Sequence, residues 1–587
     1  MKLFSRVKRM QALCMALALA CTLLGGLSCS KGEAPLASGG AFGYLPETCT
    51  NIVVLPGHEQ SMRYLFSLAV YLFGQEAVQE LRNTLFKNLH NETGLDLLSP
   101  ASLEKNGFAS RAPFVFAGNA KGGYYLSLPL INASRGELFM TQYAGSFTNA
   151  GNKRVAAKGT TQAILTEDRL YVFLDTVPAP ETEGELPPEL QQLMQNIRSA
   201  SLIASAYADN SMLSSFFPAV SKGRSHIRIE SVREGVQIEV KSPSELFDFF
   251  GMFRGVAPFP LSSGGSLSGT DLITFFSPDD LLTLSFTLDI NTLWQRHLRA
   301  LLYAQLERAT KGMDNPIALL LSGGKPIAEV VMGMLDIENA IIRGLTGRAG
   351  AILLSLKGFS PLAFSRMSSL NALDGVIVLE TRSTESARGI IQHLGGLSAL
   401  PTAGQLDIKI QNEGGVEFVS FAVHQRYHMP VIYLARVGKF LCVGVNKESL
   451  LTISRQGESR GNLVYLFGEQ TADTLLHTSQ DITVRASVSA LYSSVTSTLD
   501  ERTRQNLGSF AEQFRKIQAL SLARVRSEGG GSSMLLNLRF SSELPLLNPF
   551  VESSGEGDPL LVFLGILLAA IFLTPVVLLI VRKIRYR

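Results

Sequence analysis

The chain has few cysteines, and they form no pattern that would build a metal or redox site. Only five of its 587 residues are cysteine, and Cys14 and Cys21 lie in an apolar N-terminal stretch. No C-x-x-C pair and no closely spaced Cys/His set occurs, which excludes a zinc knuckle and a thioredoxin-type motif. Beyond residue 29 only Cys49 and Cys442 remain. These two can form one disulfide in an oxidising compartment or stay as separate buried thiols.

A clustered basic surface is also missing. The formal net charge is +3, but eight of the basic residues stand at the two ends of the chain, four before residue 10 and four after residue 581. The region between these ends therefore carries a net charge of −5. Binding to nucleic acid requires basic residues gathered on one face, so nucleic acid is excluded as a partner.

The known signatures of nucleophilic or metal catalysis are incomplete. A G-x-S-x-G match at Ser459 has a predicted helix before it and a predicted strand after it, the reverse of a hydrolase elbow. The S-x-x-K matches at Ser102 and Ser322 lack the accompanying S-D-N and K-T-G boxes. His424 and His428 lie on a strand-like segment, where positions four apart are about 13 Å from each other, too far for one metal ion. The sequence therefore assigns no catalytic, cofactor-binding or metal-ligating residue, and no cofactor is expected.

Residues 1–28 have the layout of an export signal. A basic start is followed by an apolar run and by small residues. The stretch "GLSC" that ends at Cys29 resembles a bacterial lipobox, which predicts cleavage before Cys29 and lipidation of its thiol. The polar residues 29–42 would then form a flexible tether. Two alternatives stay open: cleavage by ordinary signal peptidase at Ala18-Leu19-Ala20, or an uncleaved N-terminal anchor.

The other end of the chain predicts a transmembrane helix at residues 559–581. No charge occurs from Leu560 to Val581, and about 22 residues at about 1.5 Å each span roughly 33 Å, the thickness of the hydrocarbon core. The basic tail 582–587 is expected in the cytoplasm, which places the body of the chain outside it. Residues 544–558 would form a juxtamembrane linker. The membrane is therefore an expected partner, through this helix and through a lipid at Cys29.

Between the two ends, the glycine- and serine-rich residues 261–269 divide the body into units 43–260 and 270–543. The two units share features in the same order, beginning with "YLPETCTNIVVLP" in the first and "FFSPDDLLTLSFTLD" in the second. An Arg-Ala entry to a strand recurs in "RAPFVFAG" and "RAGAILLSL", and both units close on a charged hairpin with glycine at its turn. We therefore predict an α+β fold of two tandem, duplicated units, each a mostly antiparallel sheet with helices on one face.

This layout resembles a bacterial family of exported, membrane-anchored proteins of unknown function. The match is strongest in "MPVIYLARVGKFLCVGVNKESLLTIS", residues 429–454. The resemblance implies location and fold, because the family carries no established activity.

Anchoring and repetition, without a recognisable catalytic set, favour a non-enzymatic cell-envelope protein. Its duplicated body would bind an envelope protein, a lipid or a glycan outside the cytoplasm, at a groove near the junction of the two units. The alternative is an envelope hydrolase whose site is assembled from residues distant in sequence. A further alternative, a eukaryotic type I protein, rests on the sequons at Asn91 and Asn132.

Overall fold

The structure is a computed structural model. It describes residues 40–73, 99–119, 123–175, 177–183, 190, 193, 201–209, 223–232, 235–242, 270–287, 289–295, 299–300, 303–304, 307, 329, 332–333, 336–356, 374–399, 406–423, 431–457, 463–467, 472, 475, 479–497, 515–526 and 532–542. The signal, Cys29, the junction at 261–269 and the predicted membrane helix at 559–581 lie outside these residues.

Contacts within the chain divide it into two compact units. The first holds the described residues of the ranges 1–248, 512–518 and 529–574, and the second holds those of 249–511, 519–528 and 575–587. The first unit therefore includes a strand from near the C-terminus of the chain.

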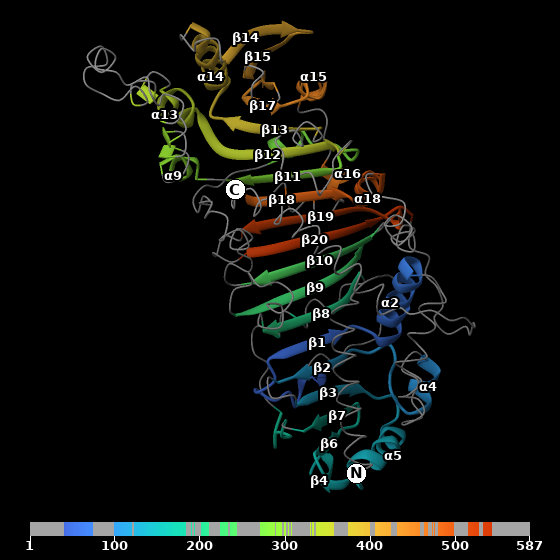
Figure 1. The fold of residues 1–587 in the computed structure, drawn as a ribbon. Coiled ribbons are helices and arrows are strands. Elements are labelled where there is room, and N and C mark those ends of the chain that lie inside the picture. The colour runs from blue at the N-terminus through green and yellow to red at the C-terminus, as the bar shows by residue number, and fades with distance from the viewer. Residues whose placement is uncertain are drawn as a thin grey trace. The chain divides into compact units, whose positions relative to one another are not determined.

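The first unit is built on an antiparallel sheet (Figure 1). In order across the sheet its strands are β4 (Thr148–Ala150), β5 (Lys153–Lys158), β6 (Thr161–Leu165), β7 (Arg169–Leu174), β3 (Tyr124–Pro129), β2 (Phe114–Gly118), β1 (Asn51–Leu55), β8 (Leu202–Asp209), β9 (Arg224–Val232), β10 (Gly235–Ser242) and β20 (Ser532–Phe540).

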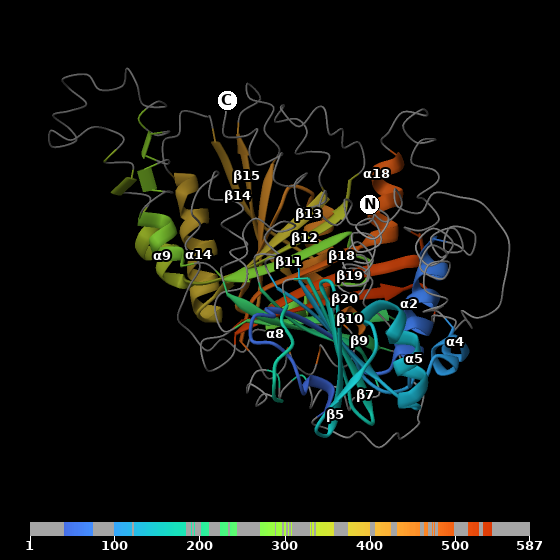
Figure 2. The same cartoon turned by 90° about the horizontal axis from the view of Figure 1, so that it is seen from below.

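Both faces of this sheet are buried over β7. Tyr171 and Phe173 belong to one core, which the 3-10 turn η1 (Gly40–Phe42) covers. Leu170, Val172 and Leu174 belong to a second core with helix α5 (Ala133–Ala144). Because consecutive residues of a strand point to opposite faces, β7 is buried on both faces and its residues after Arg169 are apolar without alternation. Helices α2 (His58–Phe73), α4 (Pro100–Lys105) and α5 gather on the same side of the sheet (Figure 2).

The second unit is also built on an antiparallel sheet. Its strands follow the order β19 (Ile517–Arg526), β18 (Ser479–Ser487), β11 (Leu282–Thr287), β12 (Leu345–Ser355), β13 (Asp374–Thr381), β17 (Phe440–Gly444), β16 (Ile432–Val437), β15 (Val416–Val423) and β14 (Leu406–Glu413). Its helical elements are α8 (Thr270–Ile273), α9 (Ile290–Leu293), α13 (Ile337–Ala340), η4 (Ile342–Gly344), α14 (Thr384–Gly396), η7 (Leu397–Ala399), α15 (Lys447–Gln456), α16 (Leu463–Phe467) and α18 (Val488–Ser497).

In the second unit helices lie on both faces of the sheet. Leu441 of β17 belongs to the core under α14, together with Ile390 and Ile391. The next residue, Cys442, points the other way, toward α15, which packs against β17. The alternation of side chains along β17 therefore separates α14 from α15.

Local sequence explains where these elements begin and end. The side chains of Asn132, Ser383 and Asn446 accept hydrogen bonds from the first backbone amides of α5, α14 and α15, as N-cap residues do. The two-residue turn between β14 and β15 is Gly414-Gly415, with φ of 60° and 82°. Those left-handed angles suit glycine and match the twist of a tight hairpin.

The strand pairing of the first unit recurs in the second. β1 lies between β2 and β8, β3 pairs with β7, and β7, β6, β5 and β4 follow in turn. The second unit has the same pairing with strand numbers that are higher by ten: β11 lies between β12 and β18, β13 pairs with β17, and β17, β16, β15 and β14 follow in turn. The recurring sequence features fall on strands with equal positions in this order, such as β2 and β12.

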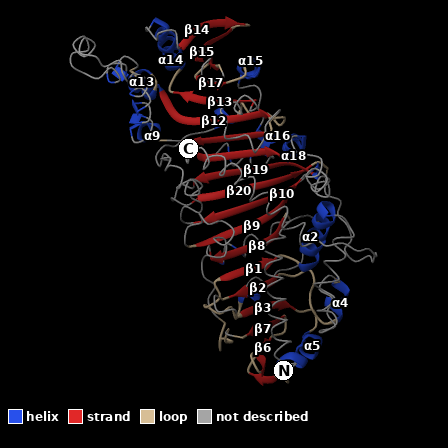
Figure 3. Ribbon diagram, viewed as in Figure 1, coloured by secondary structure: helices blue, strands red, loops and turns tan. Residues whose placement is uncertain are grey.

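The predicted fold class, α+β units with helices on one face of each sheet, is wrong. The twenty described strands pair antiparallel, the described helices are few, and α14 and α15 lie on opposite faces of the sheet (Figure 3). Within the described ranges no helix has the length and apolar character needed to cross a membrane, and the helix predicted at 559–581 lies outside those ranges. The apolar run "NLVYLFG", interpreted as a strand, contains helix α16 instead, because a short apolar run fits either structure.

Candidate functional site

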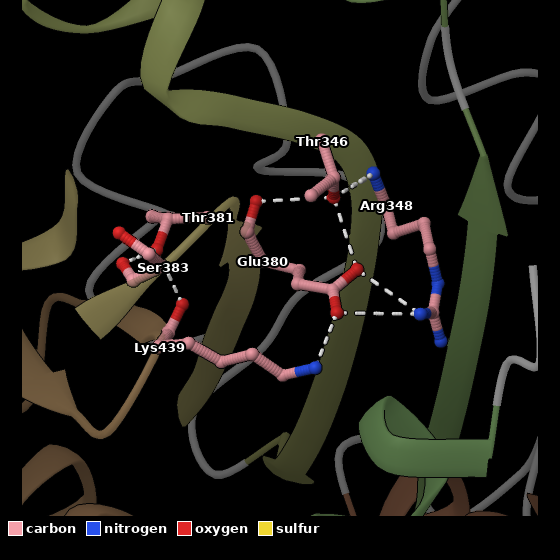
Figure 4. Close-up of polar contacts among 6 residues, drawn as sticks. All are labelled: Thr346, Arg348, Glu380, Thr381, Ser383 and Lys439. Atoms are coloured by element: carbon pink, nitrogen blue, oxygen red, sulfur yellow. Dashed lines mark hydrogen bonds and ion pairs between the residues drawn. The ribbon is translucent and has the colours of Figure 1, made fainter. Parts of the chain in front are cut away.

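A buried charge cluster of the second unit surrounds Glu380 on β13 (Figure 4). Its Oε1 accepts hydrogen bonds from Lys439 Nζ at 2.9 Å and from Arg348 Nη1 at 3.3 Å. Its Oε2 lies 3.1 Å from the same Arg348 Nη1 and accepts from the Thr346 hydroxyl at 3.0 Å. The side chains of Arg348 and Glu380 are only 7% and 5% exposed, whereas Lys439 is 34% exposed.

This cluster ties strands together. Arg348 and Thr346 come from β12, Glu380 from β13, and Lys439 from the turn between β16 and β17. Each oxygen of the carboxylate already has two polar partners, so neither is free to take a proton from a substrate. The arrangement is that of a structural ion pair, in which burial is offset by the partner charges.

In the first unit, Ser205 on β8 and His226 on β9 form a serine–histidine pair. Ser205 Oγ and His226 Nε2 are 2.8 Å apart, a distance that a nucleophile and its base require. Ser205 is 1% exposed and His226 8% exposed, so a substrate has no access to the hydroxyl. Burial, Lys241 and Arg228 together lower the pKa of His226 to about 4, which keeps the ring neutral at pH 7.

A surface pocket of about 550 Å³ lies at the β4 end of the first unit; we call it the β4–β6 pocket. Its floor is one face of the sheet: Thr148 pairs with Val155 and Val155 with Ile164, while Ala157 pairs with Gln162. Directly paired residues of an antiparallel sheet point to the same side. Small side chains at this face leave the space open.

The segment Ala179–Glu181 forms the facing wall of the β4–β6 pocket. Two hydrogen bonds hold it there: the Ala179 amide donates to Gln162 Oε1 at 2.9 Å, and Lys153 Nζ donates to the Glu181 carbonyl. Hydroxyl, amide, ammonium and carboxylate groups therefore border a floor of alanine and aliphatic side chains. Thr148, Ala157, Gln162 and Glu181 are exposed, so the pocket is open to solvent.

Most of the candidate site residues named from the sequence are not among the residues that the structure describes. Cys29, Ser459, Ser322, His424 and His428 all lie outside the described residues. Ser102 lies in the first turn of α4, where its backbone amide donates a hydrogen bond to the side chain of the N-cap residue Ser99. In the part of the chain that the structure describes, no group of three or more His, Cys, Asp or Glu residues could hold a metal ion.

Sequence reasoning missed Glu380, the Ser205–His226 pair and the β4–β6 pocket. Each depends on which strands are neighbours, which the residue order does not show. For the pocket alone, the hairpin "KRVAAKGTTQAIL" carries a signal in its polar and small residues, and it forms most of the pocket floor.

Both body cysteines are free and buried, one in each unit. Burial raises the pKa of Cys49 and of Cys442 to about 12. We therefore expect neither thiol to react with a maleimide at pH 8 in the native protein, and both to react after unfolding, because the thiolate is the nucleophile. Peptide mapping by mass spectrometry measures this, and rapid native labelling of either cysteine would contradict it.

Comparison with known proteins adds no family. No family model matches the chain, and no curated protein matches it. A solved structure described as crystal form I of TP0453 matches with a TM-score of 0.22 and 10% identity, over 40% of this chain and 90% of that chain. A likeness at that level carries no argument about this chain.

Proposed function

We propose that this chain is a non-enzymatic binding protein of the bacterial cell envelope, tethered by a lipid at Cys29, and that the β4–β6 pocket holds a segment of glycan. The export signal and lipobox-like stretch support the location. The observation that carries the glycan assignment is the pocket itself. Its volume falls within the range of about 300–1,000 Å³ that is usual for ligand sites.

The chemistry of the pocket fits a sugar better than an acyl chain. Sugar hydroxyls both donate and accept hydrogen bonds, and Thr148, Gln162 and Glu181 offer both kinds of partner. The apolar floor at Val155 and Ala157 suits the flat C–H face of a sugar ring. An acyl chain would need an enclosed apolar cavity, because its binding is driven by the apolar area that is removed from water. An open pocket with a polar rim would leave much of that area in water.

The alternative of an envelope hydrolase has one observation in its favour, the hydrogen bond between Ser205 and His226. Both side chains are buried within the pairing of β8 and β9. A hydroxyl without access to a substrate serves the fold, so we favour binding over catalysis.

The pocket assignment predicts that Ala157→Phe lowers glycan affinity at least tenfold. Ala157 is exposed and lines the floor, so the larger ring fills the pocket without entering a core. Isothermal titration with soluble tetrasaccharides of glucose, galactose and N-acetylglucosamine measures the affinity. The matched control is Ala101→Phe, an exposed position of α4 in the same unit that does not line the pocket. Equal affinities for both variants, or no binding by the wild-type protein, would contradict the proposal.

A further inference from the structure

The first described residues of the chain, beginning at Gly40, lie near the β4–β6 pocket. The Tyr171 hydroxyl donates to the carbonyl of Gly40 at 2.5 Å. Tyr44 packs edge-on against Tyr171, with ring centroids 4.9 Å apart. Lys153, which lines the pocket, lies 4.7 Å from the centroid of the Tyr44 ring. The start of the described chain is therefore fixed next to the pocket through these three side chains.

Sequence distance limits how far this entry point lies from Cys29. At about 3.5 Å per residue, the stretch from Cys29 to Gly40 spans at most about 40 Å. Tyr171 stands on β7, which is three strands from β4 but seven strands from β20 across the sheet. At about 4.8 Å per strand these separations are about 14 Å and about 34 Å. The pocket thus lies at the end of the sheet nearer to the tether.

We propose that the β4–β6 pocket binds the sugar headgroup of a glycolipid in the membrane that holds Cys29. The inference rests on the proposed function, because it needs both the lipid at Cys29 and glycan binding at the pocket. A short tether keeps the pocket within a few tens of ångströms of the bilayer. Headgroups of the same membrane are then present at a high effective concentration, whereas distant glycan polymers are not.

The polarity of the pocket decides which part of a glycolipid it takes. Gln162 and Lys153 line the pocket and hold its wall at Ala179–Glu181, so polar side chains border the opening. A headgroup can enter such a site from the side while its acyl chains stay in the bilayer. The shared chemistry of a free oligosaccharide and a glycolipid headgroup is the sugar ring, so the test must separate these two sources.

The test uses the full chain acylated at Cys29 in phosphatidylcholine vesicles. A fluorescent donor is placed on Asn149→Cys, an exposed position of β4 beside the pocket, and an acceptor on lipid headgroups. Cys49 and Cys442 are buried and do not compete for the dye. We expect vesicles with a few per cent of galactosyl, glucosyl or N-acetylglucosaminyl lipid to raise energy transfer at least twofold, and an excess of the matching soluble oligosaccharide to reverse the rise.

The variants make the outcome specific. Ala157→Phe is expected to abolish the rise and Ala101→Phe to keep it, while Cys29→Ser should lose it at the same protein concentration. If the protein binds soluble tetrasaccharides but no glycolipid changes the transfer, this inference is overturned and the proposed function survives. An equal rise with Cys29→Ser would also overturn it, because the tether would then contribute nothing. If no soluble sugar binds, the proposed function itself fails.

Discussion

Replacing Glu380 with glutamine should lower the free energy of unfolding of the second unit by about 3–5 kcal/mol. The substitution keeps the shape of the side chain but removes its charge. Arg348, whose side chain is 7% exposed, would then be buried without its counter-charge. Lys439, at 34% exposure, can turn to solvent, so the cost arises mainly at Arg348. Because the chain has two units, one transition cannot be assumed to report both.

Trp294 gives a probe for this unit alone. It is the only tryptophan of the chain, is 5% exposed and belongs to the second unit. Urea titration followed by its fluorescence therefore measures the Glu380→Gln effect where it arises. The matched control is Glu417→Gln, which removes an ion pair to Arg436 with both side chains partly exposed; we expect a loss of under about 1 kcal/mol.

A double variant separates charge from packing. Arg348→Met combined with Glu380→Leu removes both buried charges, and we expect it to be more stable than Glu380→Gln alone, because the charge that loses its partner, Lys439, is partly exposed and none stays buried. A Glu380→Gln loss as small as that of Glu417→Gln would show that the cluster is not a structural ion pair.

His226 should make the first unit sensitive to acid. Its pKa is lowered from 6.5 to about 4 in the folded protein, by burial first and then by Lys241 and Arg228. The unfolded chain takes up a proton at this ring below about pH 6.5, whereas the folded chain resists it until about pH 4. His226 therefore leaves stability unchanged above pH 6.5 and lowers the free energy of unfolding by about 3 kcal/mol as pH falls to 4 and below.

The groups around His226 show why protonation is unfavourable there. Tyr207 of β8 and Lys241 of β10 are its partners across the sheet, and Ser205 accepts or donates at Nε2. Arg228 stands two residues along the same strand and is paired with Glu230. A second positive charge at the ring would lie between Lys241 and Arg228. Glu239, which shares this face, already pairs with Lys241 at 3.1 Å.

Carboxylates titrate in the same pH range, so the comparison with His226→Gln isolates the histidine. Urea titrations between pH 4 and 8, read by a brief thiol-labelling pulse at Cys49 in the first unit, give the stability at each pH. We expect the variant to lose about 3 kcal/mol less than the wild-type protein between pH 6.5 and 4. Parallel curves for the two proteins would refute the assignment, whatever the variant costs at neutral pH.

The sequence alone determined those features that depend on neighbouring residues. The segments "RLYVFL" and "FLCVG" became β7 and β17, although β7 is buried on both faces and does not alternate, and the helix-like stretch after Asn446 became α15. The recurring features of the two halves fall on strands that occupy equal positions in the pairing order, such as β1 and β11. Turn glycines and N-caps act over three or four residues, so they can be read directly from the chain.

Only the tertiary structure decided which faces are covered and which side chains meet. Periodicity shows that a helix has an apolar face, but not which face of a sheet it will cover; α14 and α15 take opposite faces because they follow different strands of the second unit. Glu380 meets Lys439, and Ser205 meets His226, through strand registers that join residues distant in sequence. A pocket or an ion pair is a property of such registers, and sequence order does not specify which strands become neighbours until the whole sheet has formed.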